Sequence, residues 1–385
     1  MKIFKVSILL TITCCTLGII AFTNYSIIER AAYAADNCDF TSTCTNTQTG
    51  IDNSQTNDCT NFSTCINDGR GAGNTQSNLC DSVSVSGCSN FANGDTNNHI
   101  INCKVVNPDA CSNFAVGDDN SQNMACTNIG SLGCANNVLL GDDNTQKLDC
   151  TDVGYCITHA NGDGNFQKIH CNSQAGESGC ISLVSNGNGN IQESDCSSVG
   201  SPLFVSGCDN FLASGDNNRQ KIDCKSVGEV GCSNDLGFSA SANVQSINCR
   251  YVGTDGCINH GDGDGNNQNI NCRNIGATLL GCINISVGND KTQNIKCISV
   301  TVSCLNKSQG DGNNQKIFCL HSSQCTNEIN SPTDGNSQKT ICVNSGTCQN
   351  DGTDTKVISV KSSSCKNEVS GSTTICVNNR IINRP

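Results

Sequence analysis

The sequence contains no tryptophan, and aromatic residues of all kinds make up only 4% of its 385 residues. Proline and methionine are also scarce, with four and two residues. Without bulky apolar side chains, a chain this rich in Gly, Asn and Ser cannot build the core of an ordinary large globular domain. Such a polar composition is typical of disordered chains, but the internal repeat described below predicts an ordered structure instead.

Basic residues are few: 22 Lys and Arg stand against 34 Asp and Glu, which gives a net charge of −12. Proteins that bind nucleic acids need a basic surface to contact phosphates. An acidic chain is also repelled by anionic lipid. The composition therefore argues against nucleic acid and against lipid surfaces as partners.

Only one long apolar segment is present, at residues 6–22. Lys2 and Lys5 precede it, and Ala32-Tyr33-Ala34 offers a small-x-small cleavage site. This order predicts a secretory signal peptide over residues 1–34 and a secreted, extracellular or cell-surface protein with no membrane span after cleavage. An uncleaved anchor is the alternative, although the segment is short for a span. Removing Lys2, Lys5, Arg30 and Glu29 takes away a net +2, so −12 becomes −14.

Cysteine is the residue that stands out. Cys14 and Cys15 lie within the predicted signal peptide, so 30 of the 32 cysteines belong to the mature chain. Cysteines of exported proteins meet an oxidising compartment and pair. No Cys-x-x-Cys motif is present, which disfavours zinc or haem.

The mature chain is an internal repeat. Gly215-Asp216-Asn217-Asn218-Arg219-Gln220-Lys221-Ile222-Asp223-Cys224 reads like Gly310-Asp311-Gly312-Asn313-Asn314-Gln315-Lys316-Ile317-Phe318-Cys319, and a second half of the form Cys-x-Asn follows each of them. The cysteines that end the first half recur every 21 to 28 residues. A period in this range is typical of solenoids. We expect a Cys-rich repeat domain over residues 35–376 and a tail or cap over residues 377–385.

Alternation within the repeat predicts strands. Asn218, Gln220, Ile222 and Cys224 occupy every second position and share one face, while charged residues lie between them. The expected fold is all-β: a parallel β-solenoid of about 15 rungs of about 23 residues, stapled by cysteines, with two short strands per rung and a length of roughly 70 Å. A parallel β-helix with three strands per rung is the alternative.

The Gly-x-x-Asn-x-Gln phrase, with its inward Asn and Gln, resembles the repeats of curlin, the subunit of bacterial curli fibres. That resemblance implies strand-loop-strand repeats and fibre assembly. Curlin repeats lack paired cysteines, whereas one Cys pair per rung is similar to beetle antifreeze solenoids. The flat Thr-x-Thr array of those proteins is absent here.

We predict that the cysteine ending the first strand of a rung bonds to the cysteine opening the second. Two facing sheets lie about 10 Å apart, so these bonds require the sheets to converge. The predicted pairs are Cys59–Cys65, Cys80–Cys88, Cys103–Cys111, Cys126–Cys134, Cys224–Cys232 and Cys319–Cys325.

Acidic residues recur at one turn of the repeat. Stacked carboxylates repel one another, and a calcium ion would relieve the repulsion. The alternative is that Gly-Asp forms the turn and does nothing more. The candidate calcium ligands are Asp95, Asp142, Asp163, Asp216, Asp262 and Asp311.

The sequence offers no catalytic motif, and its five histidines occupy different repeat positions, with His99 at a position that holds Gln in other repeats. We therefore expect a protein that is not an enzyme and has no cofactor other than calcium. The leading hypothesis is a structural or adhesive component of the cell surface or extracellular matrix, which associates with itself or with surface components. A calcium-, glycan- or ice-binding solenoid is the alternative, and a carbohydrate-active β-helix enzyme is the third.

Overall fold

The computed structural model describes residues 34–36, 43–60, 64–82, 87–106, 111–129, 133–172, 179–198, 207–227, 231–237, 240–252, 256–276, 281–330, 335–351, 355–360, 364–367, 373–376 and 381–382. Side chains are described within these ranges from Thr45 to Asp351, except at Thr60, Val105 and Val106. All described residues belong to one compact unit, Ala31–Pro385. The predicted signal peptide lies outside them apart from Ala34, and so does the predicted tail apart from residues 381–382.

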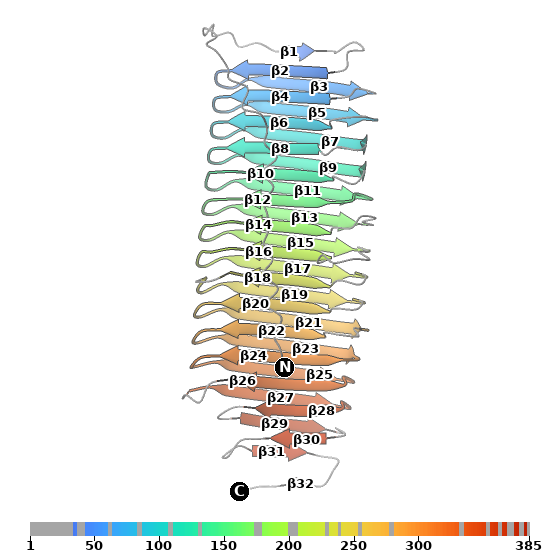
Figure 1. Ribbon diagram of the computed structural model, residues 1–385, viewed down its shortest axis with the longest axis vertical. Helices are drawn as coiled ribbons and strands as arrows, with labels where there is room; N and C mark the ends of the chain where they lie inside the picture. Colours follow the sequence, from blue (N-terminus) through green and yellow to red (C-terminus); the bar gives the residue numbers. More distant parts are fainter. Residues whose placement is uncertain are drawn as a thin grey trace, which may run out of the picture. The chain divides into compact units, whose positions relative to one another are not determined.

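The described chain is an all-β parallel solenoid in which each rung gives one strand to each of two sheets (Figure 1). The first sheet contains β1 (Ala34–Asp36), β3 (Ser54–Thr60), β5 (Thr75–Asp81), β7 (Asn98–Val106), β9 (Ser121–Ile129), β11 (Thr145–Thr151), β13 (Phe166–Asn172), β15 (Ile191–Ser197), β17 (Arg219–Lys225), β19 (Val244–Arg250), β21 (Asn267–Ile275), β23 (Thr292–Val300), β25 (Asn314–Leu320), β27 (Ser337–Val343), β29 (Thr355–Val360), β31 (Thr373–Cys376) and β32 (Ile381–Ile382). The second sheet contains β2 (Thr43–Thr49), β4 (Thr64–Arg70), β6 (Cys88–Asn93), β8 (Cys111–Val116), β10 (Cys134–Val138), β12 (Cys156–Ala160), β14 (Cys180–Val184), β16 (Cys208–Leu212), β18 (Cys232–Leu236), β20 (Cys257–Asp262), β22 (Cys282–Val287), β24 (Ser303–Gln309), β26 (Gln324–Ile329), β28 (Thr347–Asp351) and β30 (Ser364–Asn367).

Rungs stack with equivalent residues in register. In the first sheet, β17 pairs with β19 so that Gln220 lies beside Gln245 and Cys224 beside Cys249. The second sheet has 15 strands, and 13 disulfides are described, from Cys59–Cys65 to Cys342–Cys348. The predicted fold class and two strands per rung are confirmed, and the number of rungs is close to the expected fifteen.

The predicted alternation is confirmed. In β17 the buried residues are Gln220, Ile222 and Cys224, and the charged residues between them are exposed. The buried amides form two columns along the axis, named here the Gln column (first sheet) and the inner Asn column (second sheet). The Gln245 side-chain amide donates to Gln220 Oε1 (3.0 Å) and to the His260 carbonyl across the core (2.9 Å). Such bonds satisfy a polar interior that would otherwise be costly.

The turn from the second sheet to the first requires glycine. Gly71 has φ +116°, and a Cβ atom there would lie 2.0 Å from the Gly50 carbonyl oxygen. Two residues later the backbone is again left-handed, as at Asn217 (φ +57°). Only glycine tolerates the first of these conformations at such a close approach, which explains the Gly that opens most repeat phrases; Ala240 holds this place before β19.

Candidate functional site

The disulfides form a stack through the core. The Cα atoms of the described pairs lie 6.3–6.7 Å apart. The two sheets therefore converge where a strand of the first sheet ends and the next strand of the second sheet begins. All described bonded cysteines are buried. The structure joins each of the six predicted pairs: Cys59–Cys65, Cys80–Cys88, Cys103–Cys111, Cys126–Cys134, Cys224–Cys232 and Cys319–Cys325.

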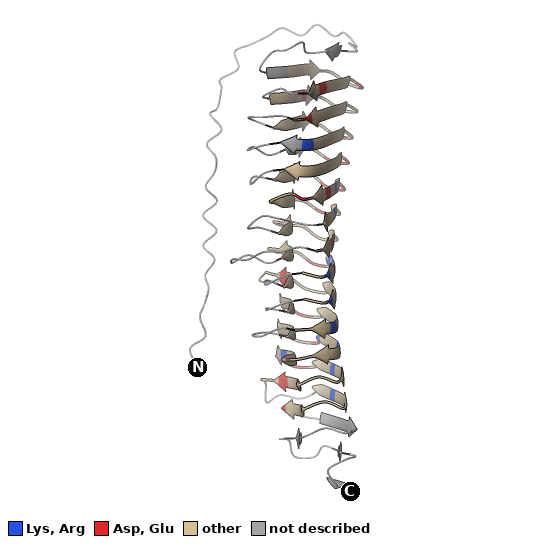
Figure 2. Ribbon diagram, turned by 90° about the vertical axis from the view of Figure 1, so that its right-hand side faces the viewer, with Lys and Arg blue, Asp and Glu red and all other residues tan. Residues whose placement is uncertain are grey.

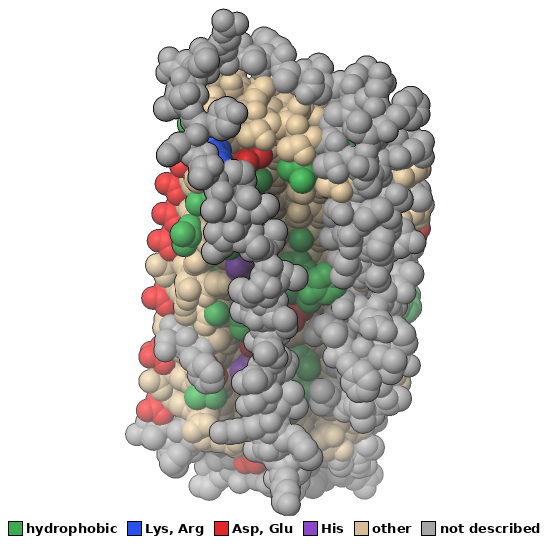
Figure 3. Space-filling model, turned by 45° about the horizontal axis from the view of Figure 1, so that its top comes forward, with side chains coloured by type: hydrophobic (Ala, Val, Ile, Leu, Met, Phe, Trp, Pro, Cys, Tyr) green, Lys and Arg blue, Asp and Glu red, His purple; other side chains and the backbone are tan. Residues whose placement is uncertain are grey.

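Five of the six predicted calcium ligands lie in one column at the edge of the rod, called here the corner column; its acidic residues mark the left edge in Figure 3. Each side-chain Oδ1 accepts the backbone N–H of the corresponding residue on the next rung, as from Asp163 to Asp142 (2.7 Å). The corner column comprises Asp95, Asp118, Asp142, Asp163, Asn188, Asp216, Ser241, Asp264, Asn289 and Asp311.

The sixth predicted ligand, Asp262, does not belong to the corner column. The segment Gly261-Asp262-Gly263-Asp264 contains Gly-Asp twice, and the structure uses the second copy for the turn. Asp264 therefore accepts the N–H of Asn289 (2.7 Å), and Asp262 ends strand β20.

The corner column has a structural role without any cation, because its carboxylates satisfy backbone donors. This also explains why Asn188 and Asn289 replace Asp, since an amide oxygen accepts the same hydrogen bond. Among the described residues, the groups of three or more His, Cys, Asp or Glu ligand atoms that lie within 4.8 Å of one another consist of disulfide-bonded cysteines. Calcium binding at the corner column remains a prediction.

A second asparagine column follows the turn, called here the turn Asn column. In it the backbone N–H of each Asn donates to Oδ1 of the Asn on the next rung, as from Asn74 to Asn97 (2.9 Å). Lys291 replaces Asn in this column, so Asn266 meets a side chain with no acceptor. Lys291 is only 1% exposed, which is unusual for a lysine.

The buried ammonium of Lys291 donates to the carbonyl oxygens of Gly261 (3.1 Å) and Val287. Burial lowers the pKa of Lys291 to about 8, although the negative charges of Asp262 and Asp264 oppose that shift. The adjoining inward positions of β20, β22 and β24 hold the small residues Gly261, Ser286 and Ser308. These small side chains leave room for the lysine stem.

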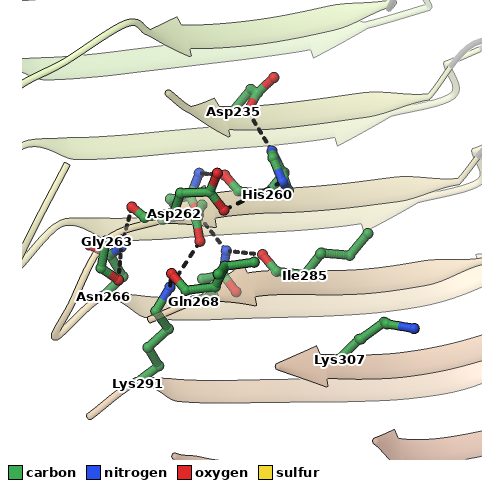
Figure 4. A network of polar contacts seen from close by, with 12 residues as sticks. Asp235, His260, Asp262, Gly263, Asn266, Gln268, Ile285, Lys291 and Lys307 are labelled. Carbon is green, nitrogen blue, oxygen red and sulfur yellow. Dashed lines mark hydrogen bonds and ion pairs between the residues drawn. The ribbon is translucent and has the colours of Figure 1, made fainter. Parts of the chain in front are cut away.

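A charged network lies next to Lys291 on β18 and β20 (Figure 4). His260 Nδ1 donates to Asp235 Oδ1 (2.9 Å), and its Nε2 lies 3.9 Å from Asp262 Oδ1. The hydrogen bond to Asp235 raises the pKa of His260 against the opposing effect of burial. Sequence reasoning missed this network; its only signal is the extra Gly-Asp together with Lys at a position that holds Asn elsewhere.

His99 occupies the Gln column between Gln76 and Gln122, as predicted. It is fully buried, and neither ring nitrogen has a hydrogen-bond partner. Gln76 Oε1 is also buried without a partner, because no amide stands on the next rung to donate to it. Burial lowers the pKa of His99 to about 4.

No described helix has the length and apolar character needed to cross a membrane. The chain was compared with models of protein families, with curated proteins and with solved structures, and none of them matches. The likeness to curlin and to antifreeze solenoids therefore stands at the level of the repeat, as a β-solenoid with a Cys pair in each rung from β3–β4 to β27–β28.

Proposed function

We propose that this chain is a secreted, non-enzymatic structural or adhesive protein of the cell surface or extracellular matrix, and that its function is the rod itself. The observation that carries this proposal is where the repeated residues point. The Gln, Asn and Cys that recur in most rungs are buried, and they bond to neighbouring rungs or across the core. The repeated residues therefore serve the stiffness and the length of the rod.

The compartment follows from the cysteines. Thirteen described disulfides within one chain form and persist in oxidising surroundings, outside the bacterial or eukaryotic cytosol. The predicted signal peptide supplies the route. Together they support secretion, with localisation outside the cell or on its surface.

The outward histidines do not form a catalytic arrangement with the polar residues beside them. His159 Nε2 contacts Ser185 Oγ (2.7 Å), and His260 contacts Asp235 (2.9 Å). These contacts lie on different rungs, β12–β14 and β18–β20, so they share no serine, histidine and acid. A glycoside hydrolase uses a pair of carboxylic acids that face each other across a cleft, and these histidine contacts do not supply such a pair.

The carboxyl-terminal end differs from the rest of the stack. β32 pairs with β31 in the antiparallel direction, whereas the other pairings in the two sheets are parallel. A strand that runs the opposite way is a poor template for the next parallel rung, and it covers part of the edge of the first sheet, at Ile375 and Cys376. We propose that this end is a cap that limits fibre growth.

Electron microscopy of the secreted, oxidised protein tests the proposal. We expect discrete rods of uniform length that bind to isolated cell envelopes or matrix, and no release of reducing sugars from a polysaccharide panel. Truncation after Cys348 should increase polymerisation, with circular dichroism and a thiol count to check folding. Turnover of a polysaccharide contradicts the structural role, and long fibres that disappear on truncation contradict the cap.

A further inference from the structure

The outer face of the second sheet carries large apolar side chains among its polar ones, which is unexpected in a chain this polar. The middle row of this face, called here the central column, is made of the second outward-pointing residue after the cysteine of each strand. From β4 to β14 the central column contains Asp68, Phe91, Phe114, Asn137, His159 and Leu183. From β16 to β26 it contains Phe211, Asp235, His260, Ile285, Lys307 and Glu328.

A parallel row, called here the flanking column, lies two residues earlier on each strand. From β6 to β14 it contains Ser89, Ser112, Ala135, Ile157 and Ile181. From β16 to β24 it contains Asp209, Ser233, Ile258, Ile283 and Leu305. Figure 3 shows hydrophobic side chains on this face, whereas most lysines and arginines lie on strands of the first sheet (Figure 2). No described element packs on this face.

The face is large enough for a stable contact. The strands β6 to β24 span about 45 Å at roughly 4.8 Å per strand, and five residues of each strand span about 15 Å. One copy therefore offers about 700 Å², and two copies would bury about 1,400 Å². Stable protein–protein interfaces bury about 1,200–2,000 Å² in total. Two flat sheets also pack face to face readily.

We propose that this face binds the same face of a second copy, in an antiparallel homodimer whose two-fold axis passes between β14 and β16. In such a contact a residue on one rung meets the residue equally far beyond the axis in the partner, and the reverse contact forms as well. The inference goes beyond the proposed function and does not depend on it.

Near the axis, most facing residues of the central column are complementary. Leu183 meets Phe211, and His159 meets Asp235. Farther from the axis, Phe114 meets Ile285. From the axis outward, the facing pairs of the central column are Leu183–Phe211, His159–Asp235, Asn137–His260, Phe114–Ile285, Phe91–Lys307 and Asp68–Glu328.

The two ends of the central column each carry an ion pair. Arg70 Nη2 lies 3.7 Å from Asp68 Oδ2, and Lys307 Nζ donates to Glu328 Oε1 (2.8 Å). In the dimer Asp68 lies opposite Glu328 of the partner, which is a like-charge contact. Arg70 and Lys307 lie beside these two carboxylates, so each end of the interface holds two positive and two negative charges, and the cations offset the repulsion.

The flanking column places small residues against large ones. Ser89 meets Leu305, Ser112 meets Ile283, and Ala135 meets Ile258 in the partner. Large-to-small facing positions let two sheets interlock, as in a packed core. The single mismatch is Asp209, which meets Ile181 beside the axis, so Asp209→Ala should tighten the dimer.

Sedimentation equilibrium of the oxidised mature chain tests this arrangement. We expect a dimer at micromolar concentration. Phe114→Glu should weaken it at least 100-fold, because each dimer would then bury two carboxylates, whereas Val244→Glu on the first sheet should leave it unchanged. Circular dichroism and a free-thiol count establish that each variant is folded.

A rescue pair identifies the register. Residues 114 and 285 lie seven rungs and about 34 Å apart within one chain, but they meet in the dimer. Phe114→Glu combined with Ile285→Lys should restore the dimer, and Phe114→Glu combined with Leu183→Lys should not. A wild-type chain that stays monomeric at 100 µM overturns the proposal, whether or not that chain floats with phosphatidylcholine vesicles. Equal rescue by both lysines overturns it too, as does a Phe114→Glu variant that dimerises like the wild type.

Discussion

Replacing His99 with glutamine should stabilise the protein, because it repairs the one described break in the Gln column. A glutamine there can donate one amide hydrogen to Gln76 Oε1, which is buried without a partner, and the other to a carbonyl of β8. Its Oε1 can accept from the Gln122 amide on the next rung. An unpaired buried polar group costs about 1–3 kcal/mol, so the gain at pH 7 should be about 2–4 kcal/mol.

The gain should grow as the pH falls. The pKa of His99 is about 4 in the native state, below its ordinary value of 6.5, so the unfolded chain binds more protons between these values. The wild type therefore loses stability as the pH drops from 6.5 towards 4, by about 3 kcal/mol at pH 4. The glutamine variant lacks this loss.

Guanidinium unfolding of the oxidised chain, followed by circular dichroism at pH 7 and pH 4, measures both effects. Gln122→His is the matched control, since it creates a second break in the Gln column and should destabilise. The reasoning is refuted if the variant is no more stable than the wild type at pH 7, or if the difference between them stays constant down to pH 4.

Four further predictions address other features. Lys291→Asn should raise the free energy of unfolding, because it completes the turn Asn column. The pKa of Lys291 is about 8 in the native state, below its ordinary value of 10.5. The stability of the wild type should therefore rise between pH 8 and pH 10.5, and that of the variant should not. Gly71→Ala should cost more than about 3 kcal/mol from its 2.0 Å contact, whereas Gly189→Ala, with φ +66° and nothing within 4 Å, should cost only about 1–2 kcal/mol in thermal unfolding. If the corner column binds calcium, millimolar calcium should raise the melting temperature and a chelator should lower it; no shift either way would leave its aspartates as turn formers. Alkylation of the mature chain without reductant, read by mass spectrometry, should find almost no free thiols, and removing both cysteines of one rung should cost about 2–3 kcal/mol.

Much of the fold could be predicted because each repeat contains a complete set of local instructions. Alternation at period two identifies the strands and their buried residues, as for Gln220, Ile222 and Cys224 in β17. A cysteine at the end of one strand and another at the start of the next leave only one short-range pairing. Repetition then implies stacking in register, since equivalent residues must meet to bury the same face.

The candidate site was predicted less well where two local solutions compete. Asp262 and Asp264 are equally good turn residues by sequence, and the stacking of Gly263 on its neighbours selects Asp264 for the corner column. The burial of Lys291 was also missed. It depends on the small side chains of Gly261, Ser286 and Ser308, which lie 30, 5 and 17 positions away from Lys291.

The all-β solenoid, the two strands per rung, the disulfide pairs and the amide columns could therefore be predicted from the amino-acid sequence, because they follow from spacing within one repeat. Which side chains from different rungs meet on the surface becomes clear only from the folded chain. Neighbours there are some 21 to 28 residues apart, as His159 and Ser185 are 26 apart and His260 and Asp235 are 25 apart. The outward rows vary freely from repeat to repeat, since no ladder or disulfide constrains them. Their apolar and charged patterns become visible only when the register of the stacked rungs is fixed.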